Sequence, residues 1–88
     1  MIIEALTIKE KFLLLLYDSI SRGDASDWAT SLMDCSDKKD LFFLNIENEK
    51  KIWDAILFID KYAEKISPEA YLYSKEDLKR YVESEDWI

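Results

Sequence analysis

The sequence predicts an all-α protein, a compact bundle of three to four helices in a single domain spanning residues 1–88. Three observations lead to this fold class. A chain of 88 residues can form one small core but not two. Its hydrophobic share of 49% is too high for a disordered acidic tail. Apolar residues recur at helical spacing in several segments, whereas no pair of segments resembles partnered strands.

A first helix is predicted from about Ile8 to Arg22. Thr7 and Glu10 have the spacing of a capping box, in which a hydroxyl and a carboxylate satisfy backbone N–H groups at the helix start. The apolar positions that follow a helical period are Ile8, Phe12, Leu13, Leu15, Leu16 and Ile20. Gly23 stands where a left-handed residue is expected to end the helix.

A short second helix is predicted next, with Asp24 or Ser26 as its N-cap and Asp27 in its first turn. Its apolar face comprises Trp28, Ala29, Leu32 and Met33. We expect this helix to stop near 34–36, before the polar break at 37–40.

The following run, Leu41-Phe42-Phe43-Leu44, is too short to distinguish a strand from a helix. A lone strand is marginally stable, and no other segment resembles a partner for it. A helical turn or an extended plug into the core is therefore favoured over a sheet.

A long third helix is predicted from about Glu47 to Ile66, with Asn45 or Asn48 as its cap. The core stripe comprises Ile52, Ile56, Ile59, Ala63 and Ile66, extended on its flanks by Trp53, Leu57 and Phe58. Pro68 ends the helix, because the residue before a proline is pushed out of the helical region.

Residues 68–73 form a connection, and a last helix begins after Ser74, its predicted N-cap. Glu76 and Asp77 then lie at the positive end of the helix dipole. The buried face comprises Leu78, Tyr81 and Val82. We expect Trp87 and Ile88 to dock back onto the body.

The composition excludes most catalytic and metal chemistry. The chain has one cysteine and no histidine, so zinc sites and Ser-His or Cys-His nucleophiles cannot be built. The segment 34–40 lacks the glycine and the alternating acids of a calcium loop. Cys35 is expected to be a small buried or half-buried residue. We therefore expect no enzyme, no metal and no cofactor; paired carboxylates alone leave an enzyme as a remote alternative.

Charge and cysteine usage also constrain the partner and the compartment. With 19 acidic against 12 basic residues, the net charge is −7, which repels nucleic acid. A single cysteine excludes a disulfide-stapled scaffold, so a reducing cytoplasmic setting is expected. The longest apolar run, Phe12 to Tyr17, is far shorter than the roughly 20 residues that span a bilayer. No membrane association is expected.

The third predicted helix carries the first candidate binding surface. At about 100° per residue, one flank of its apolar face collects Glu49, Trp53, Asp60 and Glu64. Three carboxylates around a tryptophan suit a basic partner, since the acids pair with Lys or Arg while the ring supplies apolar contact. The alternative is that Trp53 belongs to the core and the acids are its solvated rim.

Two further candidates lie on either side of this helix in the sequence. The first is the aspartate set Asp24, Asp27, Asp34, Asp37 and Asp40, whose members are individually explained as cap or loop residues. The second is the pair Tyr71 and Tyr73 in the connection, close to Glu69, Glu76 and Asp77. Loop aromatics are stronger indicators of binding than aromatics on a helix face, although both tyrosines also suit the core.

Three stretches resemble a bacterial family in their order and approximate spacing. They are Ser26-Asp27-Trp28-Ala29, Ile52-Trp53-Asp54-Ala55-Ile56 and Tyr71-Leu72-Tyr73-Ser74-Lys75-Glu76-Asp77-Leu78. They resemble the small helical immunity proteins of contact-dependent growth inhibition and colicin-like systems, over about Arg22 to Glu83. Residues 41–45 have no counterpart in this resemblance.

The resemblance implies an immunity protein that neutralises a cognate basic toxin, a nuclease domain in our expectation, as a monomer or a 1:1 heterodimer. The partner-binding residues we predict are Glu49, Trp53, Asp60, Glu64, Tyr71, Tyr73, Glu76 and Asp77. An acidic regulatory or adaptor module, or a nucleic-acid mimic that binds a basic protein, is the alternative.

Overall fold

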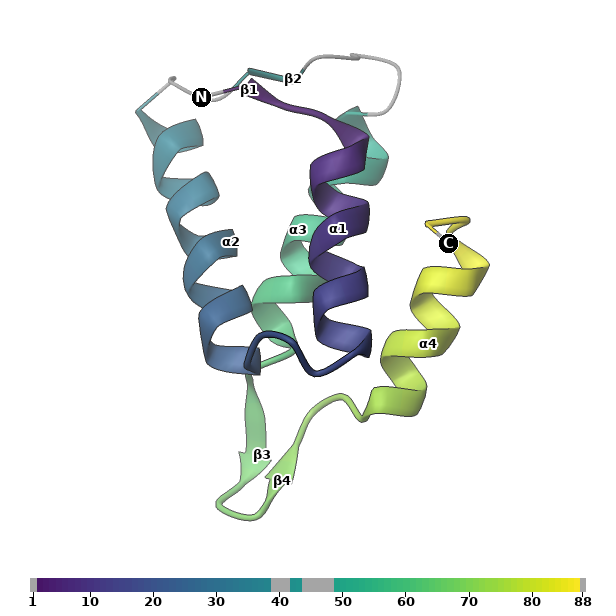
Figure 1. Ribbon diagram of the computed structural model, residues 1–88. Coiled ribbons are helices and arrows are strands. Elements are labelled where there is room, and N and C mark those ends of the chain that lie inside the picture. Colours follow the sequence, from purple (N-terminus) through teal and green to yellow (C-terminus); the bar gives the residue numbers. More distant parts are fainter. Residues whose placement is uncertain (1, 39–41, 44–48, 88) are drawn as a thin grey trace.

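The computed structural model describes residues 2–38, 42–43 and 49–87. The helices within these residues are α1 (Ala5–Leu16), α2 (Arg22–Asp37), α3 (Glu49–Lys61) and α4 (Lys75–Ser84). In Figure 1, α1 runs between α2 and α4, and α3 lies behind it. The most extensive helix contact joins α2 to α3, and α1 touches all three other helices. The predicted fold class, a small helical bundle in one domain, is confirmed.

One apolar core joins the four helices. Its buried side chains are Ile8, Phe12 and Leu15 of α1, Ala25, Ala29 and Leu32 of α2, Ile52, Ala55, Ile56 and Ile59 of α3, and Leu78 and Val82 of α4. These positions repeat every three or four residues in each helix, which turns one face of every helix inward. Trp28, Met33, Trp53 and Tyr81 pack against this core while half-buried, and Cys35 is also half-buried as expected.

The boundaries predicted for the first helix are wrong at both ends. α1 begins at Ala5, so Thr7 lies inside it and Glu4 occupies the N-cap without a side-chain hydrogen bond. The helix ends at Leu16 because Asp18 adopts the left-handed conformation, with φ of 57°. Gly23 does not end α1; it lies in the first turn of α2.

The end of α1 is a Schellman motif. The Ser19 N–H donates to the Leu14 carbonyl at 2.8 Å, and the Asp18 N–H donates to the Leu15 carbonyl at 3.2 Å. The two bonds satisfy carbonyls that the last helical turn leaves open. Aspartate tolerates the left-handed region better than most residues, so this motif forms without glycine.

The end of α4 repeats this motif and brings Trp87 into the core. Asp86 has φ of 57°, and the Trp87 N–H donates to the Val82 carbonyl at 2.9 Å. Trp87 is 5% exposed, with its ring centroid 5.7 Å from that of Phe12. The predicted docking of Trp87 is confirmed, whereas Ile88 lies outside the described residues.

The N-cap of α2 lies three residues before Asp24 and five before Ser26, the two predicted cap positions. Ser21 is the N-cap, and its hydroxyl accepts a hydrogen bond from the Asp24 N–H at 3.0 Å. Neither Asp24 nor Ser26 caps the helix, because both lie inside it. α2 ends at Asp37, one residue after the predicted stop, so the start of the predicted polar break is helical.

The prediction for Phe42 and Phe43 is wrong, because both lie in a sheet. β2 (Phe42–Phe43) pairs in parallel with β1 (Ile2–Ile3), and Ile2 is opposite Phe42. The N-terminal residues supply the strand partner that the sequence pattern did not reveal, since two residues are too few to show a period. Leu41 and Leu44 lie outside the described residues.

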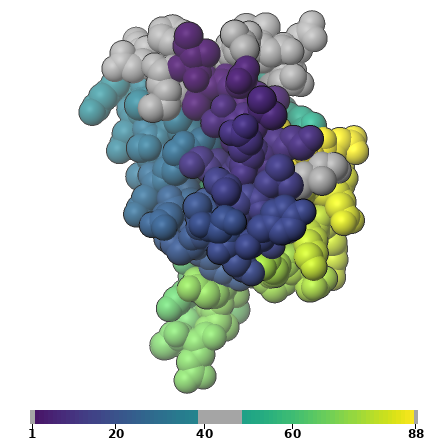
Figure 2. All heavy atoms as spheres, in the orientation of Figure 1, coloured from purple at the N-terminus to yellow at the C-terminus, as the bar shows by residue number. Residues whose placement is uncertain are grey.

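α3 ends at Lys61, five residues before its predicted end at Ile66. β3 (Lys65–Ser67) and β4 (Ala70–Tyr71) form an antiparallel hairpin that projects from one end of the bundle (Figures 1 and 2). The predicted core position Ile66 is therefore wrong: it is 68% exposed on this hairpin, and Ala63 is only half-buried. The predicted start of the helix at Glu47 and its Asn45 or Asn48 cap lie outside the described residues.

The start of α4 confirms the sequence prediction. The Ser74 hydroxyl accepts from the Asp77 N–H at 3.2 Å, and the Asp77 carboxylate accepts from the Ser74 N–H at 2.8 Å. These reciprocal bonds form a capping box. The same backbone hydrogen bond lowers the pKa of Asp77, because it stabilises the ionised carboxylate.

Candidate functional site

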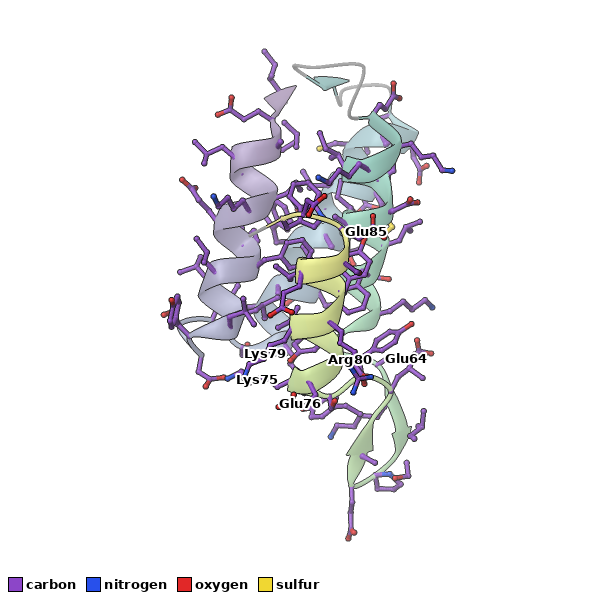
Figure 3. The ribbon with its side chains drawn as sticks, turned by 90° about the vertical axis from the view of Figure 1, so that its right-hand side faces the viewer. Glu64, Lys75, Glu76, Lys79, Arg80 and Glu85 are labelled. Atoms are coloured by element: carbon purple, nitrogen blue, oxygen red, sulfur yellow. The ribbon has the colours of Figure 1, made fainter. Side chains whose placement is uncertain are left out.

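A groove of about 340 Å³ lies between α3 and α4. The residues that line it are Asp54, Leu57, Phe58 and Lys61 of α3, Tyr73 of the connection, and Tyr81 and Glu85 at the end of α4. The four α3 residues have the i, i+3, i+4, i+7 spacing that places them on one flank of a helix. Figure 3 looks onto α4 from this side, with Glu85 at the end of the helix away from the hairpin. We call this hollow the α3–α4 groove.

Aromatic rings form the floor of the α3–α4 groove. The rings of Phe58 and Tyr81 stack almost in parallel, with centroids 4.1 Å apart and an interplanar angle of 4°. Tyr73 also contacts Phe58, at a centroid distance of 4.9 Å and an interplanar angle of 35°. Three rings in contact through Phe58 make a rigid apolar surface.

Two carboxylates flank this aromatic floor. Burial raises the pKa of Tyr81 to about 12, and the negative charges of Glu85 and Asp54 add to the shift. Within the described parts of the chain, Asp54 and Glu85 form no salt bridge. Both residues are exposed, so a cation outside the molecule can reach their carboxylates.

This arrangement suits the side chain of an arginine or a lysine. A cation over the aromatic floor is attracted by the negative faces of the rings. Carboxylates at the edge of the same hollow provide charge-assisted hydrogen bonds to it. The groove thus has groups that suit a basic side chain, and the one cation in its own lining, Lys61, lies 3.4 Å from the Glu64 carboxylate.

Three of the four residues of the strip predicted on the third helix, Glu49, Trp53 and Asp60, lie on one flank of α3 at i, i+4 and i+11, whereas Glu64 does not belong to the helix. The Asp60 carboxylate accepts hydrogen bonds from the hydroxyls of Ser26 and Thr30, each at 3.2 Å, and so joins α3 to α2. Glu64 lies beyond the end of α3, where its carboxylate is 3.4 Å from the Lys61 ammonium. Asp60 therefore faces α2, on the side of α3 away from the groove.

The other two members of the strip, Glu49 and Trp53, are neighbours at i and i+4 on α3. Glu49 lies in the first turn of α3, and Trp53 is half-buried and packs against the core. The packing of Trp53 agrees with its alternative interpretation as a boundary residue of the core. Contact of Glu49 and Trp53 with a partner stays a prediction.

The two predicted tyrosines are held by Arg22. The guanidinium carbon lies 4.0 Å from the ring centroids of both Tyr62 and Tyr71. Its Nη1 donates to the Tyr73 carbonyl at 2.6 Å and to the Tyr62 carbonyl at 3.0 Å. Arg22 thereby fixes the projecting hairpin to the bundle. Tyr73 enters the α3–α4 groove, whereas Tyr71 lies on the hairpin with 42% of its surface exposed.

The two acids predicted at the start of α4 lie in a field of mixed charge. The Asp77 carboxylate is engaged in the capping box, and Arg80 lies 3.8 Å from it. Figure 3 shows Glu76 at the start of α4, along a face that also carries Lys75, Lys79 and Arg80. Of the eight predicted residues, Tyr73 alone lines the groove.

Sequence reasoning missed Asp54, Phe58, Tyr81 and Glu85 as members of one site. The sequence predicts Phe58 and Tyr81 on the core faces of their helices, and the acidic strip that it predicts lies on another flank of α3. The signal was present in two pairs with i, i+4 spacing, Asp54 with Phe58 and Tyr81 with Glu85. Their convergence depends on how α4 packs on α3, which the sequence does not show.

The aspartates of α2 form a second negative surface. Asp24, Asp27, Asp34 and Asp37 are all exposed and share one side of the helix. Asp40, the fifth member of the predicted set, lies outside the described residues. In Figure 1, α2 and α4 occupy opposite sides of α1, so the α2 aspartates are separate from the groove.

Neither the family models, nor the curated proteins, nor the solved structures contain a match to this chain. Among the residues that the structure describes, no helix has the length and apolarity needed to span a bilayer. The same residues contain no group of three or more side chains placed to hold a metal ion. The fold and the site define a small, strongly acidic helical protein with an aromatic groove flanked by carboxylates.

Proposed function

We propose that this protein is an immunity protein that binds and neutralises a cognate basic toxin domain through the α3–α4 groove. One observation carries the proposal. Asp54 and Glu85 flank a stacked aromatic floor without salt bridges among the described residues, on a chain whose net charge is −7. Such a groove is complementary to a cationic side chain, and the whole chain is complementary to a basic protein.

The net charge of the whole chain and the local contacts of the groove have different roles in this proposal. The net charge of −7, including the α2 aspartates, steers a basic toxin towards the protein and raises the association rate. The groove then retains the toxin, since buried aromatic contacts near the centre of an interface supply most of the binding energy. Fast capture followed by slow release is what neutralisation of a toxin requires.

A nuclease is the toxin class that fits this charge best. A nuclease binds a polyanion, so its active-site cleft must carry lysine or arginine side chains. An acidic protein that fills or borders this cleft excludes the nucleic acid by occupying the same positive potential. The enzyme is then inhibited without any chemical change to either protein.

The direct test measures binding to the product of the neighbouring gene by calorimetry. We expect a 1:1 complex whose association rate falls steeply between about 50 and 500 mM NaCl, because salt screens the long-range attraction. Coexpression of the two genes should also restore growth that the toxin alone prevents. A neighbouring protein that does not bind, or binding without rescue of growth, would contradict the proposal.

A pair of double variants locates the binding surface. Asp54→Lys with Glu85→Lys should weaken the complex about 100-fold, mainly through faster dissociation. Asp27→Lys with Asp34→Lys makes the same change in net charge on α2 and should mainly slow association, by about 10-fold or less. Equal losses of affinity in both variants would show that net charge alone, rather than the groove, holds the toxin.

A further inference from the structure

α1 is apolar on its outer side as well as on the side that faces the core. Leu6, Leu13 and Tyr17 follow one another at i, i+7 and i+11, roughly opposite the buried Ile8 and Phe12. Leu6 is 56% exposed and Tyr17 is 77% exposed. We call the apolar side chains Leu6, Leu13, Leu14 and Tyr17 the outer stripe.

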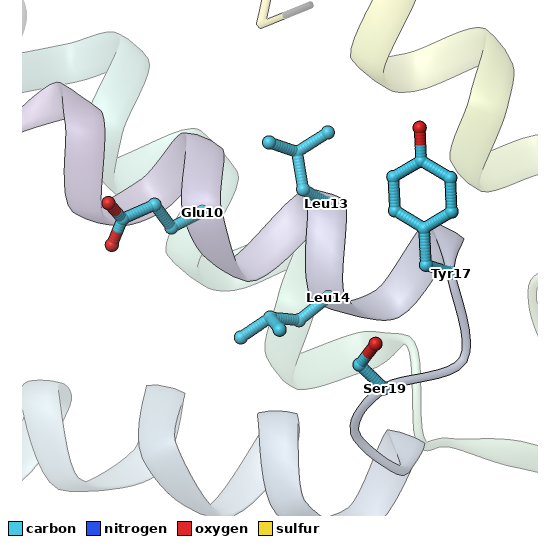
Figure 4. A pocket seen from close by; sticks show the side chains of 5 residues that line it. All are labelled: Glu10, Leu13, Leu14, Tyr17 and Ser19. Atoms are coloured by element: carbon cyan, nitrogen blue, oxygen red, sulfur yellow. The ribbon is translucent and has the colours of Figure 1, made fainter.

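The outer stripe borders a hollow of about 310 Å³. Figure 4 shows the residues that line it, with Leu13, Leu14 and Tyr17 around it and Glu10 and Ser19 at its ends. A surface helix of a monomer carries polar residues on its outer face, whereas a helix that is apolar all round is covered on both sides. In the single chain, Leu6 and Tyr17 are left exposed.

The distribution of charge over the helices indicates which kind of partner can cover the outer stripe. Of the four described helices, α1 alone has more basic than acidic residues, with Lys9 and Lys11 against Glu10. A basic partner is therefore drawn to the acidic surfaces on α2 and in the α3–α4 groove, and not to α1. A second copy of this acidic chain is repelled less by α1 than by those acidic surfaces, because Lys9 and Glu10 balance beside the stripe and the Lys11 ammonium lies over the Trp28 ring.

The charges beside the outer stripe are also self-complementary. At about 100° per residue, Lys9 and Glu10 lie on opposite sides of the line through Leu6, Leu13 and Tyr17, and Leu14 lies beyond Glu10. When two α1 helices meet in parallel about a twofold axis, the Lys9 side of one copy faces the Glu10 side of its partner. If the two helices met in an antiparallel arrangement, Lys9 of one copy would lie on the side of Lys9 of its partner, and Glu10 on the side of Glu10. Like charges would then lie together.

We propose that the outer stripe is the interface of a homodimer, in which α1 packs in parallel against α1 of a second copy. The contact is isologous, as in most symmetric dimers. A 12-residue helix is about 18 Å long, so the contact is smaller than a standard interface of about 1,600 Å². We therefore expect a weak dimer with Kd on the order of 10 μM. The homodimer leaves the α3–α4 groove open and does not depend on the proposed immunity function.

Analytical ultracentrifugation of the full chain tests the proposal between about 1 and 500 μM. We expect the mass to rise with concentration from 10.4 kDa towards twice that value. Raising the salt concentration should strengthen the dimer, because it screens the repulsion between two acidic copies. A protein that stays monomeric to 500 μM overturns the proposal.

Substitutions on the outer stripe test its location. Leu6→Glu with Tyr17→Glu should abolish the dimer, while Ile66→Glu on the hairpin, at 68% exposure, serves as the matched control and should leave it intact. Circular dichroism verifies that each variant is folded, and Tyr17→Glu alone is the milder second variant. A dimer that survives both stripe variants, or is lost equally in Ile66→Glu, overturns the proposal.

Charge exchange tests the parallel arrangement. Lys9→Glu and Glu10→Lys should each weaken the dimer about 3- to 10-fold, since each places like charges across the twofold axis. The double variant exchanges the charges on the two sides and should restore the affinity of the wild type. Failure of the double variant to recover overturns the parallel packing of α1.

Discussion

The α3–α4 groove and the outer stripe of α1 are apolar hollows of similar volume on one small chain, about 340 and 310 Å³. They differ in the charges that surround them. Three charged residues, Asp54, Glu85 and Lys61, line the groove, whereas Glu10 is the one charged residue lining the hollow of the stripe. The hollow supplies the contact area in both cases, and the surrounding charge selects the partner.

The two surfaces also differ in how the chain builds them. The outer stripe belongs mostly to one helix and follows directly from the spacing of Leu6, Leu13 and Tyr17. The groove needs two helices and the connection between them, since its floor is the stack of Phe58 with Tyr81 and Tyr73. Changes to the aromatic floor of the groove should therefore disturb folding, whereas changes to its exposed carboxylates or to the stripe should not.

The largest expected effect is that of Phe58→Ala. This change removes the ring that contacts both Tyr73 and Tyr81 and leaves a cavity in the groove floor. Because Phe58 is half-buried, we expect a loss of about 2–3 kcal/mol in the free energy of unfolding, somewhat below the cost at a fully buried site. Urea denaturation followed by circular dichroism measures it.

The matched change on the other surface is Leu6→Ala. Leu6 is 56% exposed, so its truncation should alter the unfolding free energy of the monomer by no more than about 0.5 kcal/mol. Measurements below 1 μM protein keep the dimer from contributing. Equal losses for Phe58→Ala and Leu6→Ala would contradict the contrast between the two surfaces.

A smaller effect is expected from Arg22→Lys, which tests how the groove keeps Tyr73 in place. Lysine retains the charge but loses the planar group that lies over two tyrosine rings and donates to the Tyr73 and Tyr62 carbonyls. We expect a loss of about 1–2 kcal/mol in stability. We also expect faster hydrogen exchange at the Leu72 amide, which donates to the Glu64 carbonyl.

Arg80→Lys is the control for this variant. Arg80 is exposed on α4, and its guanidinium lies 3.8 Å from the Asp77 carboxylate. Surface ion pairs of this kind contribute little, so we expect a change within about 0.5 kcal/mol. If both arginine variants behave alike, Arg22 does not hold the hairpin and Tyr73 is positioned by other contacts.

The sequence predicted the fold class, the four helices and the Ser74 cap because each depends on local signals. Helical periodicity identified Ile52, Ile56 and Ile59 as core residues, and all three are buried. The same periodicity predicted a third helix that is too long, because Ile66 continues the period by chance after the chain has turned into the hairpin. A period carries no information about where the backbone leaves a helix.

The candidate site was less predictable because its residues converge only through packing. The sequence indicated an acidic surface with aromatic anchors, and Tyr73 does line the groove. It placed the acids on the flank of α3 that carries Asp60, which instead accepts hydrogen bonds from α2. The orientation of α3 between its neighbours decides which flank is open, and that orientation is a property of the whole core.

The last prediction concerns the Tyr81 hydroxyl, which loses its proton only in alkaline solution. Its effect on stability is the smallest at neutral pH and the most specific to the groove. Burial raises its pKa to about 12 from the ordinary value of 10.0, with Glu85 and Asp54 adding to the shift. Between these values the folded chain keeps a proton that the unfolded chain has lost. Stability should therefore fall as the pH rises above about 10, and less so in Tyr81→Phe.

Absorbance of the tyrosinate band separates the two causes of this shift. Tyr81→Phe should remove the last titrating step, and Tyr17→Phe on the outer stripe should leave it in place. Because burial is the larger cause, Phe58→Ala should lower the pKa of Tyr81 more than Glu85→Gln does. The opposite order would show that the negative charges of the carboxylates, rather than burial, dominate the shift in the pKa of Tyr81. The groove would then attract cations more strongly than its aromatic floor alone does.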